Sequence, residues 1–195
     1  MSEMQEPVLF PEAEPQPPSV LRSACFSGHR LEKLPMGVAR KVLMSMLQEE
    51  IHRAVSQGVT TFYCGAADGI DLFAADLVRR MRETTPELRI ICVKPFRDFG
   101  KKLNGSDRYL FNMVMMESTA VIELSDHYYP DCFRVRNQYL VDHSDLLIAV
   151  MGESRSGTGQ TIRMAQRRRI PVRLIDVTAV EQHLSDRPQL VQLTY

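Results

Sequence analysis

The sequence lacks paired cysteines, a net charge and any long apolar run, and each absence excludes a class of protein. Its cysteines are far apart and form no CxxC pair, so the usual zinc and dithiol motifs are missing. We therefore expect free thiols and no metal site. The 24 basic and 24 acidic residues cancel, so no overall field attracts the chain to nucleic acid or an anionic membrane. The four cysteines are Cys25, Cys64, Cys92 and Cys132.

Two further absences concern membranes and nucleic acid. No apolar stretch approaches the roughly 20 residues that span a bilayer, and the start lacks the basic and apolar regions of a secretory signal. We therefore expect a cytoplasmic protein without a membrane partner. No stripe of aromatic and basic residues is visible, which together with the neutral charge argues against a nucleic-acid partner.

The first 20 residues differ in composition from the rest of the chain. The segment EPVLFPEAEPQPPSV holds five prolines and few large apolar side chains, so it buries too little surface to offset the entropy of ordering. We predict a flexible proline-rich tail over residues 1–20. One folded domain is predicted over residues 21–195, because a chain of 195 residues is long enough for one sizeable core.

The folded part alternates short apolar runs with helical patterns. The segments between the runs carry apolar residues at helical spacing and predict helices over residues 38–55, 70–81, 107–117, 131–141 and 158–168. This alternation predicts an α/β fold, a Rossmann-like doubly wound and mainly parallel sheet of about six strands with helices on both faces. The predicted strands are RSACFSG, VTTFYCG, LRIICVKPF, TAVIELS, DLLIAVMG and IPVRLIDV.

Glycine-rich and polar loops follow three of the predicted strands. In an open parallel α/β sheet, ligands bind beyond the carboxyl ends of the strands, where helix N-termini offer unpaired amides to an anion. Neither a complete Walker A motif nor a complete GxGxxG is present, and one glycine loop alone is as consistent with a turn as with a phosphate site. Three such loops favour one shared ligand. The candidate residues are Gly28, His29, Arg30, Gly65, Asp68, Gly69, Asp71, Gly157, Thr158, Gly159 and Thr161, with Arg136 and Asn137 from an amphipathic helix whose polar face is their alternative role.

Several candidate side chains have alternative roles that the sequence leaves open. Arg30 can clamp a phosphate as a planar fork and His29 can donate a hydrogen bond or a proton, but a His-Arg pair is also common in solvated loops. Asp68 and Asp71 can cap the following helix or accept hydrogen bonds from ribose hydroxyls.

The polar loops also carry a family resemblance. As an ordered set, CFSGHRLEKLPMG, FYCGAADGIDLFAADLV, KPF, RVRNQYLVDHSDLLIAV and SGTGQTIRMAQRRRIPV make residues 24 to about 176 resemble the YpsA-like branch of the SLOG superfamily. This resemblance implies a Rossmann-like domain that binds a nucleotide or a nucleotide-derived ligand, such as a nucleotide-sugar or ADP-ribose, at the strand ends. We expect the role of such binding to be regulatory or sensing. Relatives in the superfamily include the LOG phosphoribohydrolases and the DNA-processing protein DprA.

The same comparison argues against the best-known catalytic activity of the superfamily. LOG enzymes carry a PGGxGTxxE loop whose glutamate acts at the ribosyl bond, whereas Thr161 stands at that position here and cannot serve as a carboxylate. Our leading hypothesis is therefore binding of a nucleotide-like small molecule, with no certain cofactor. The alternatives are an N-glycosidic or phosphoester hydrolase that uses His29, Asp68 or Asp71, and a DprA-like nucleic-acid-binding module. The sequence leaves the oligomeric state open, a homo-oligomer included.

Overall fold

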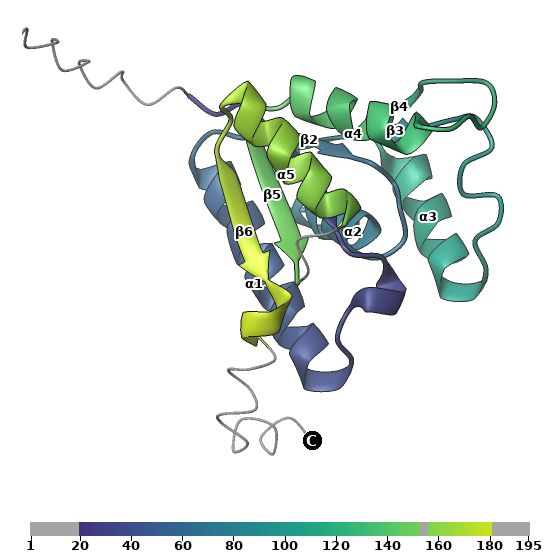
Figure 1. Ribbon diagram of the computed structural model, residues 1–195. Helices are drawn as coiled ribbons and strands as arrows, with labels where there is room; N and C mark the ends of the chain where they lie inside the picture. The colour runs from purple at the N-terminus through teal and green to yellow at the C-terminus, as the bar shows by residue number, and fades with distance from the viewer. Residues whose placement is uncertain (1–19, 153–155, 181–195) are drawn as a thin grey trace, which may run out of the picture.

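The six apolar runs form one sheet in which every neighbouring pair of strands is parallel (Figure 1). The structure is a computed structural model and describes residues 20–152 and 156–180. β5 is buried at five of its six positions, as expected for a central strand covered on both faces. The strands are β1 (Ser23–Gly28), β2 (Thr61–Cys64), β3 (Arg89–Lys94), β4 (Ala120–Glu123), β5 (Leu146–Met151) and β6 (Val172–Asp176).

Helices cover both faces of this sheet. Side chains of α1, α2 and α3 pack in one apolar cluster, and those of α4 and α5 pack in a second cluster against the alternate residues of β1 and β5. In Figure 1, α5 lies in front of β5 and α1 lies behind β6. The Rossmann-like α/β fold is therefore confirmed. The helices are α1 (Gly37–Ser56), α2 (Ile70–Met81), α3 (Gly105–Glu117), α4 (Cys132–Asp142) and α5 (Gly157–Arg168), and a 3-10 turn, η1 (Leu31–Lys33), is too short to show a period in the sequence.

The strand order β4-β3-β2-β1-β5-β6 determines where a ligand can bind. The chain builds outward from β1 through β2, β3 and β4, and then returns to add β5 and β6 on the other side of β1. The order therefore reverses between β1 and β5, and the connections that leave these strands lead to opposite faces of the sheet. A crevice forms at such a switch point, so the carboxyl ends of β1 and β5 mark the expected ligand site.

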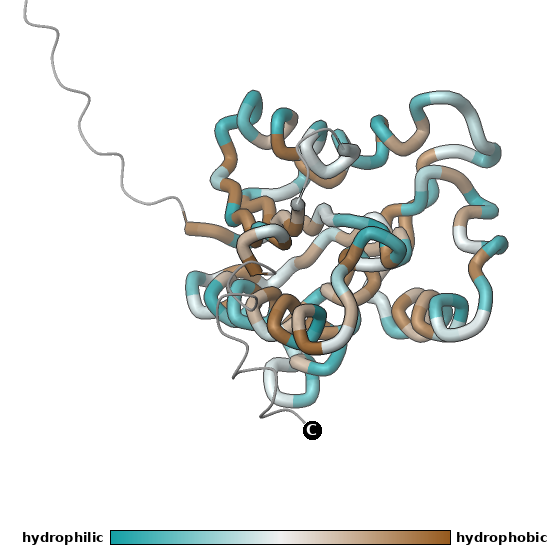
Figure 2. Tube along the Cα trace, turned by 60° about the horizontal axis from the view of Figure 1, so that its bottom comes forward, coloured by the Kyte–Doolittle hydropathy of each residue, from teal (hydrophilic) through white to brown (hydrophobic). Residues whose placement is uncertain are grey.

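The core consists of large apolar side chains on both faces of the sheet. The rings of Phe26 and Phe62 stack with 5.6 Å between their centroids. All four cysteines are buried, and burial raises the pKa of the Cys25 thiol to about 12, so this thiol behaves as a small apolar group. Figure 2 shows that many of the apolar stretches lie toward the interior of the trace and many of the hydrophilic ones on its outer turns.

The two ends of the chain are described only in part. The predicted tail lies outside the described residues except for Val20, and so does everything beyond residue 180. The boundary between tail and domain therefore stays a prediction. Within residues 20–152 and 156–180, no helix is long and apolar enough to cross a membrane.

Candidate functional site

A small cavity, which we call the polar pocket, lies at the switch point between β1 and β5. Its volume is about 220 Å³. It is formed by the end of β1, the loop after β2, α4 and the first turn of α5, so segments far apart in the sequence meet here. The lining residues are Phe26, Ser27, Gly28, His29, Arg30, Lys33, Ala67, Asp71, Phe133, Arg136, Asn137, Ser156, Gly157 and Thr158.

Most of the ligand-binding residues predicted from the sequence line the polar pocket. Those that line it are Gly28, His29, Arg30, Asp71, Arg136, Asn137, Gly157 and Thr158. Asp68 lines a neighbouring cavity. In the described part of the chain, Gly65, Gly69, Gly159 and Thr161 are not among the lining residues of either cavity.

The imidazole of His29 joins the ends of β1 and β5. Its Nε2 atom accepts a hydrogen bond of 2.8 Å from the backbone N–H of Gly152, and only 7% of the residue is exposed. In this arrangement Nε2 acts as an acceptor and carries no proton to donate. His29 therefore holds the two loops together across the crevice.

The first turn of α5 presents backbone amides to the polar pocket. Ser156 is the N-cap residue, and its hydroxyl accepts a hydrogen bond of 3.1 Å from the N–H of Gly159. Ser156, not Thr158, therefore supplies the side-chain cap of α5. The amides of Gly157 and Thr158 have no partner within the helix, as at any helix start. Thr161 is fully buried and donates its hydroxyl to the carbonyl of Gly157 at 3.0 Å.

Arg136 and Asp71 form a buried ion pair in the wall of the polar pocket. The Nη1 atom of Arg136 lies 3.1 Å from Oδ2 of Asp71, and the two side chains are 6% and 8% exposed. Gly65 leaves room for this pair, because a Cβ atom there would lie 1.5 Å from Nη1. Burial raises the pKa of Asp71 above its usual value, and Arg136 opposes that rise only in part. Asp71 therefore balances Arg136 and does not cap α2, whose N-cap residue is Gly69.

One nitrogen atom of Arg136, Nε, is both buried and without a hydrogen-bond partner among residues 20–152 and 156–180. A buried donor without an acceptor costs about 1–3 kcal/mol, so such an atom marks a place where a bound group can supply the acceptor. Arg136 also lines the polar pocket, so a group bound there is the candidate acceptor for this atom.

Two of the glycines that the sequence suggested as ligand contacts allow neighbouring loops to pack closely. A Cβ atom on Gly28 would lie 2.4 Å from the side chain of Ile70, and one on Gly69 would lie 2.5 Å from the carbonyl oxygen of His29. Gly69 also has a φ of 86°, which other residues adopt only with strain. These glycines bring the loops after β1 and β2 into contact, and the backbone N–H of Ile70 then donates to the carbonyl of His29 at 3.2 Å.

Arg30 stands between the polar pocket and a second, larger cavity. It forms an ion pair with Asp68, and its guanidinium carbon lies 6.0 Å from the ring centroid of Phe133. Arg30 and Phe133 line both cavities. The Arg30 side chain is 43% exposed, so an incoming anion can compete with Asp68 for it.

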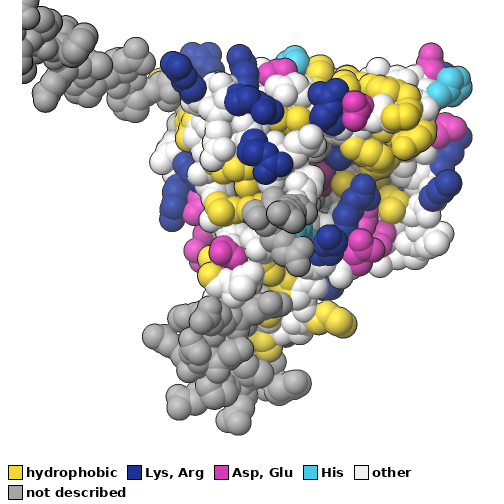
Figure 3. Space-filling model, in the orientation of Figure 1, with side chains coloured by type: hydrophobic (Ala, Val, Ile, Leu, Met, Phe, Trp, Pro, Cys, Tyr) yellow, Lys and Arg dark blue, Asp and Glu magenta, His cyan; other side chains and the backbone are white. Residues whose placement is uncertain are grey.

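The second cavity, which we call the aromatic pocket, has a volume of about 640 Å³. The sequence analysis does not predict it, because its rings come from the loop after β3, the loop after β4 and the start of α4. Figure 3 shows apolar side chains gathered where α4 and the loop before it lie, with charged side chains among them. The lining residues are Arg30, Asp68, Phe96, Asp98, Phe99, Gly100, Lys101, Lys102, Leu103, Tyr128 and Phe133.

Comparison with known families identifies the kind of protein to which these pockets belong. The family model YpsA, described as the YspA SLOG family, matches residues 26–180. The chain belongs to this SLOG family. The resemblance that the sequence motifs indicate is thereby confirmed.

The curated relatives of this SLOG chain are distant. A UPF0398 protein of Bacillus cereus strain B4264 is 24% identical over 122 residues, which cover 60% of this chain and 66% of that protein. The chain thus spans slightly less than two thirds of the length of that relative. A UPF0398 protein of Halalkalibacterium halodurans is 22% identical over 138 residues, which cover 70% of this chain and 73% of that protein.

Solved structures of DNA processing protein A share the fold of this SLOG chain. The Helicobacter pylori protein, whose structure concerns its single-stranded DNA binding mode, has a TM-score of 0.55 and 18% identity, and the match covers 87% of this chain and 74% of that one. The Streptococcus pneumoniae protein also has a TM-score of 0.55, with 15% identity and coverage of 85% and 56%. At these identities the likeness shows the fold alone.

The prediction against a nucleic-acid partner is contradicted by these neighbours. A chain with this fold, the H. pylori protein, binds single-stranded DNA. The neutral net charge of the sequence is a poor guide, because cations can still line a local site. Arg30, Lys33, Lys101 and Lys102 line the two pockets, where Arg30 pairs with Asp68 and Lys101 with Asp98. The aromatic residues that form no stripe in the sequence come together beside these cations.

Proposed function

We propose that the protein binds a phosphorylated nucleotide and that its phosphate occupies the polar pocket. The observation that carries this proposal is the unpartnered, buried Nε atom of Arg136, in the same cavity as the first turn of α5. A guanidinium group and the backbone amides of a helix N-terminus thus line one cavity at the switch point of the sheet. A phosphate would accept hydrogen bonds from Arg136 Nε and from the amides of Gly157 and Thr158.

The size of the polar pocket supports a phosphate as its occupant. Its volume of about 220 Å³ is below the roughly 300–1,000 Å³ of cavities that enclose a whole small-molecule ligand. The pocket therefore holds one end of a larger molecule. A phosphate matches the polar pocket in charge, because Arg30 and Lys33 add two further cations to the lining of the pocket.

A thermal-shift experiment tests the proposal. At 100 times its dissociation constant, AMP should stabilise the protein by about 2.7 kcal/mol, which raises Tm by roughly 5–11 °C in a domain of this size. Ribose 5-phosphate should also raise Tm, because it carries the phosphate. Equal shifts with adenosine and AMP, or no shift with any phosphorylated compound at millimolar concentration, would overturn the proposal.

A second candidate function is binding of single-stranded nucleic acid, which the H. pylori neighbour favours. The same pockets would then hold one nucleotide unit of a strand. Fluorescence anisotropy with labelled oligonucleotides separates the two functions. Affinity that grows with oligonucleotide length and falls steeply with salt, together with no measurable binding of AMP, would favour the strand.

The hydrolase alternative receives less support from the geometry. Each of its candidate acid-base groups already has a partner: His29 accepts from Gly152, Asp68 pairs with Arg30 and Asp71 pairs with Arg136. None of the three is placed as an unpaired acid or base for attack on a glycosidic bond.

We expect no LOG-type phosphoribohydrolase activity from the purified protein. Thr161 replaces the required carboxylate, and its hydroxyl is bound to the carbonyl of Gly157 inside the helix. Incubation with nucleoside monophosphates should release no free base, as measured by chromatography. Base release that disappears in Asp68→Asn or Asp71→Asn would contradict this expectation and restore the hydrolase alternative.

A further inference from the structure

The aromatic pocket has four rings in contact on its wall. Phe96 lies 5.7 Å from Phe99 and 5.7 Å from Tyr128 between ring centroids, and both pairs meet nearly edge to face. Phe133 completes the group at 6.4 Å from Phe96 and 5.9 Å from Phe99. Such a wall binds flat ring systems well, because they can stack on or pack edge to face against its members.

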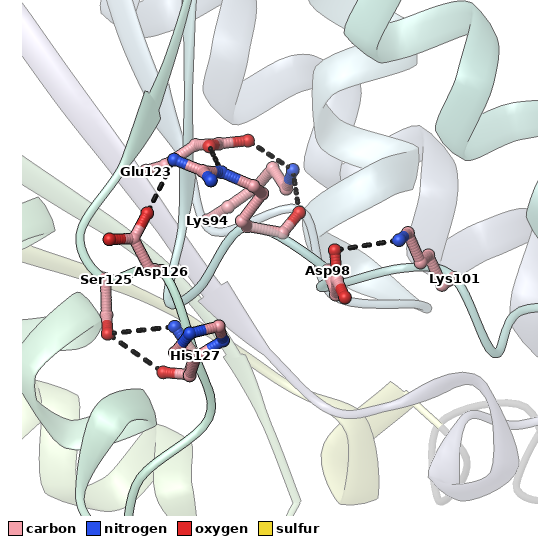
Figure 4. Close-up of polar contacts among 8 residues, drawn as sticks. Lys94, Asp98, Lys101, Glu123, Ser125, Asp126 and His127 are labelled. Atoms are coloured by element: carbon pink, nitrogen blue, oxygen red, sulfur yellow. Dashed lines mark hydrogen bonds and ion pairs between the residues drawn. The ribbon is translucent and has the colours of Figure 1, made fainter.

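Ion pairs fix the two loops that carry these rings (Figure 4). The Nζ atom of Lys94 lies 2.7 Å from Oε1 of Glu123, which joins the ends of β3 and β4. Arg97 reaches the same carboxylate at 3.3 Å and Asp126 at 2.5 Å. The hydrogen bond from Lys94 holds the pKa of Glu123 below its usual value, so the network is intact at neutral pH. These ion pairs restrict the motion of the loops that carry the rings, and less entropy is then lost when a ligand binds.

The polar and aromatic pockets adjoin. Arg30 and Phe133 belong to the lining of both, so a ligand long enough to pass these two side chains would reach both cavities. The aromatic pocket, at about 640 Å³, is also the larger of the two and falls within the size range of small-molecule sites. A molecule with a small anionic end and a larger flat end matches this arrangement.

Polar groups in the aromatic pocket indicate what kind of flat ring it takes. Asp68, Asp98, Lys101 and Lys102 line it together with the aromatic residues, and Lys101 pairs with Asp98 at 2.9 Å. A plain hydrocarbon would remove water from these groups without replacing its hydrogen bonds. A heteroaromatic ring with its own donors and acceptors satisfies them.

We propose that the aromatic pocket holds the nucleobase of the ligand whose phosphate occupies the polar pocket. This inference rests on the proposed function and adds the place and the chemistry of the second half of the ligand. The base packs against the ring wall formed by Phe96, Phe99, Tyr128 and Phe133. Arg30, at the junction, lies between the phosphate and the base.

Calorimetry with AMP and ribose 5-phosphate tests the inference, because AMP carries a base where ribose 5-phosphate has an anomeric hydroxyl. The wild-type protein should bind AMP more tightly than ribose 5-phosphate. Tyr128→Ala and Phe99→Ala should each weaken AMP binding by about 5- to 150-fold, the range for loss of one base–aromatic stack, and should leave ribose 5-phosphate binding unchanged. Tyr128→Phe keeps the ring and should bind AMP like the wild type.

Tyr109→Ala is the matched control. Tyr109 is 68% exposed on α3 and does not line the aromatic pocket, while Tyr128 is 64% exposed, so both substitutions remove a surface ring with little effect on folding. The inference is overturned if the wild type binds AMP no more tightly than ribose 5-phosphate, or if both pocket variants retain full AMP affinity. If neither ligand binds the wild type, the proposed function fails as well.

Discussion

Arg136→Met is expected to lower the free energy of unfolding by about 3–5 kcal/mol, because it leaves the carboxylate of Asp71 buried without its partner. In a domain of this size the loss corresponds to a fall in Tm of roughly 6–20 °C. Chemical denaturation at pH 7 measures it. A second substitution, Asp71→Asn, removes the unpaired charge and should restore part of the stability. A double variant no more stable than Arg136→Met would contradict this explanation.

The loss of stability in Arg136→Met should depend on pH in a defined direction. Burial already raises the pKa of Asp71 in the folded protein, and removing Arg136 takes away the charge that opposes this rise. A carboxyl group with a raised folded pKa binds protons more tightly in the native state, so stability falls as pH rises. The deficit of Arg136→Met should therefore be largest at neutral pH and should shrink as pH falls toward the ordinary aspartate value of about 3.9.

Arg134→Met provides the matched control for Arg136→Met. Arg134 lies on the same helix and pairs with Asp131 at 3.2 Å, but its side chain is 49% exposed. Exposed pairs contribute only about 0–1 kcal/mol. A loss of stability in Arg134→Met as large as that in Arg136→Met would mean that α4, not the buried pair, is the sensitive feature.

Gly157→Asp is expected to weaken the binding of AMP and ribose 5-phosphate by about 100-fold or more while the fold persists. Among residues 20–152 and 156–180, a Cβ atom at this position meets no heavy atom within 4 Å, so these residues leave room for the side chain. The new carboxylate repels the phosphate and competes for the amides at the start of α5, where a charge-assisted hydrogen bond contributes about 1.5–3 kcal/mol. Calorimetry measures the affinity and circular dichroism the fold.

The stability of Gly157→Asp separates a local effect from unfolding. An acidic residue in the first turn interacts favourably with the helix dipole by roughly 0.3–1 kcal/mol, so Tm should stay the same or rise. Gly157→Asn, of equal size but neutral, should lose much less affinity. Unchanged affinity in a folded Gly157→Asp variant would show that the loop before α5 is only a turn.

The sequence predicts the fold and the general location of the site because both depend on regular patterns. Alternating apolar runs and helical periods specify the parallel sheet, and a parallel sheet brings the loops after β1, β2 and β5 to one edge. His29 and Arg136, which are more than 100 residues apart, therefore line the same cavity.

The partners of the individual side chains could not be predicted. Nothing in the sequence indicates that Asp71 pairs with Arg136, since the contact joins α2 to α4 across 65 positions. The sequence interpretation of the glycines as ligand contacts also misses their neighbours: Gly65 accommodates an ion pair and Gly28 accommodates Ile70. Such contacts depend on side-chain packing between elements, which composition and periodicity do not record.

The aromatic pocket could not be predicted from the sequence for a related reason. Its rings are spread over residues 96–133 and follow no period, and the motif KPF contributes only one of them. Two aromatic residues close together in the loop after β3, Phe96 and Phe99, are the signal that could have indicated the pocket. Binding residues are concentrated in loops, so aromatic side chains in a loop at the carboxyl end of a parallel sheet favour a ligand site there.

An NMR titration of the wild-type protein with AMP tests most directly whether the polar pocket binds phosphate. The amide signals of Gly157 and Thr158 and the Nε–H signal of Arg136 should shift together and saturate at the same AMP concentration. Ribose 5-phosphate should move the same three signals, and adenosine should leave them in place. If AMP binds while these three signals stay unchanged, the phosphate lies elsewhere and the account is wrong.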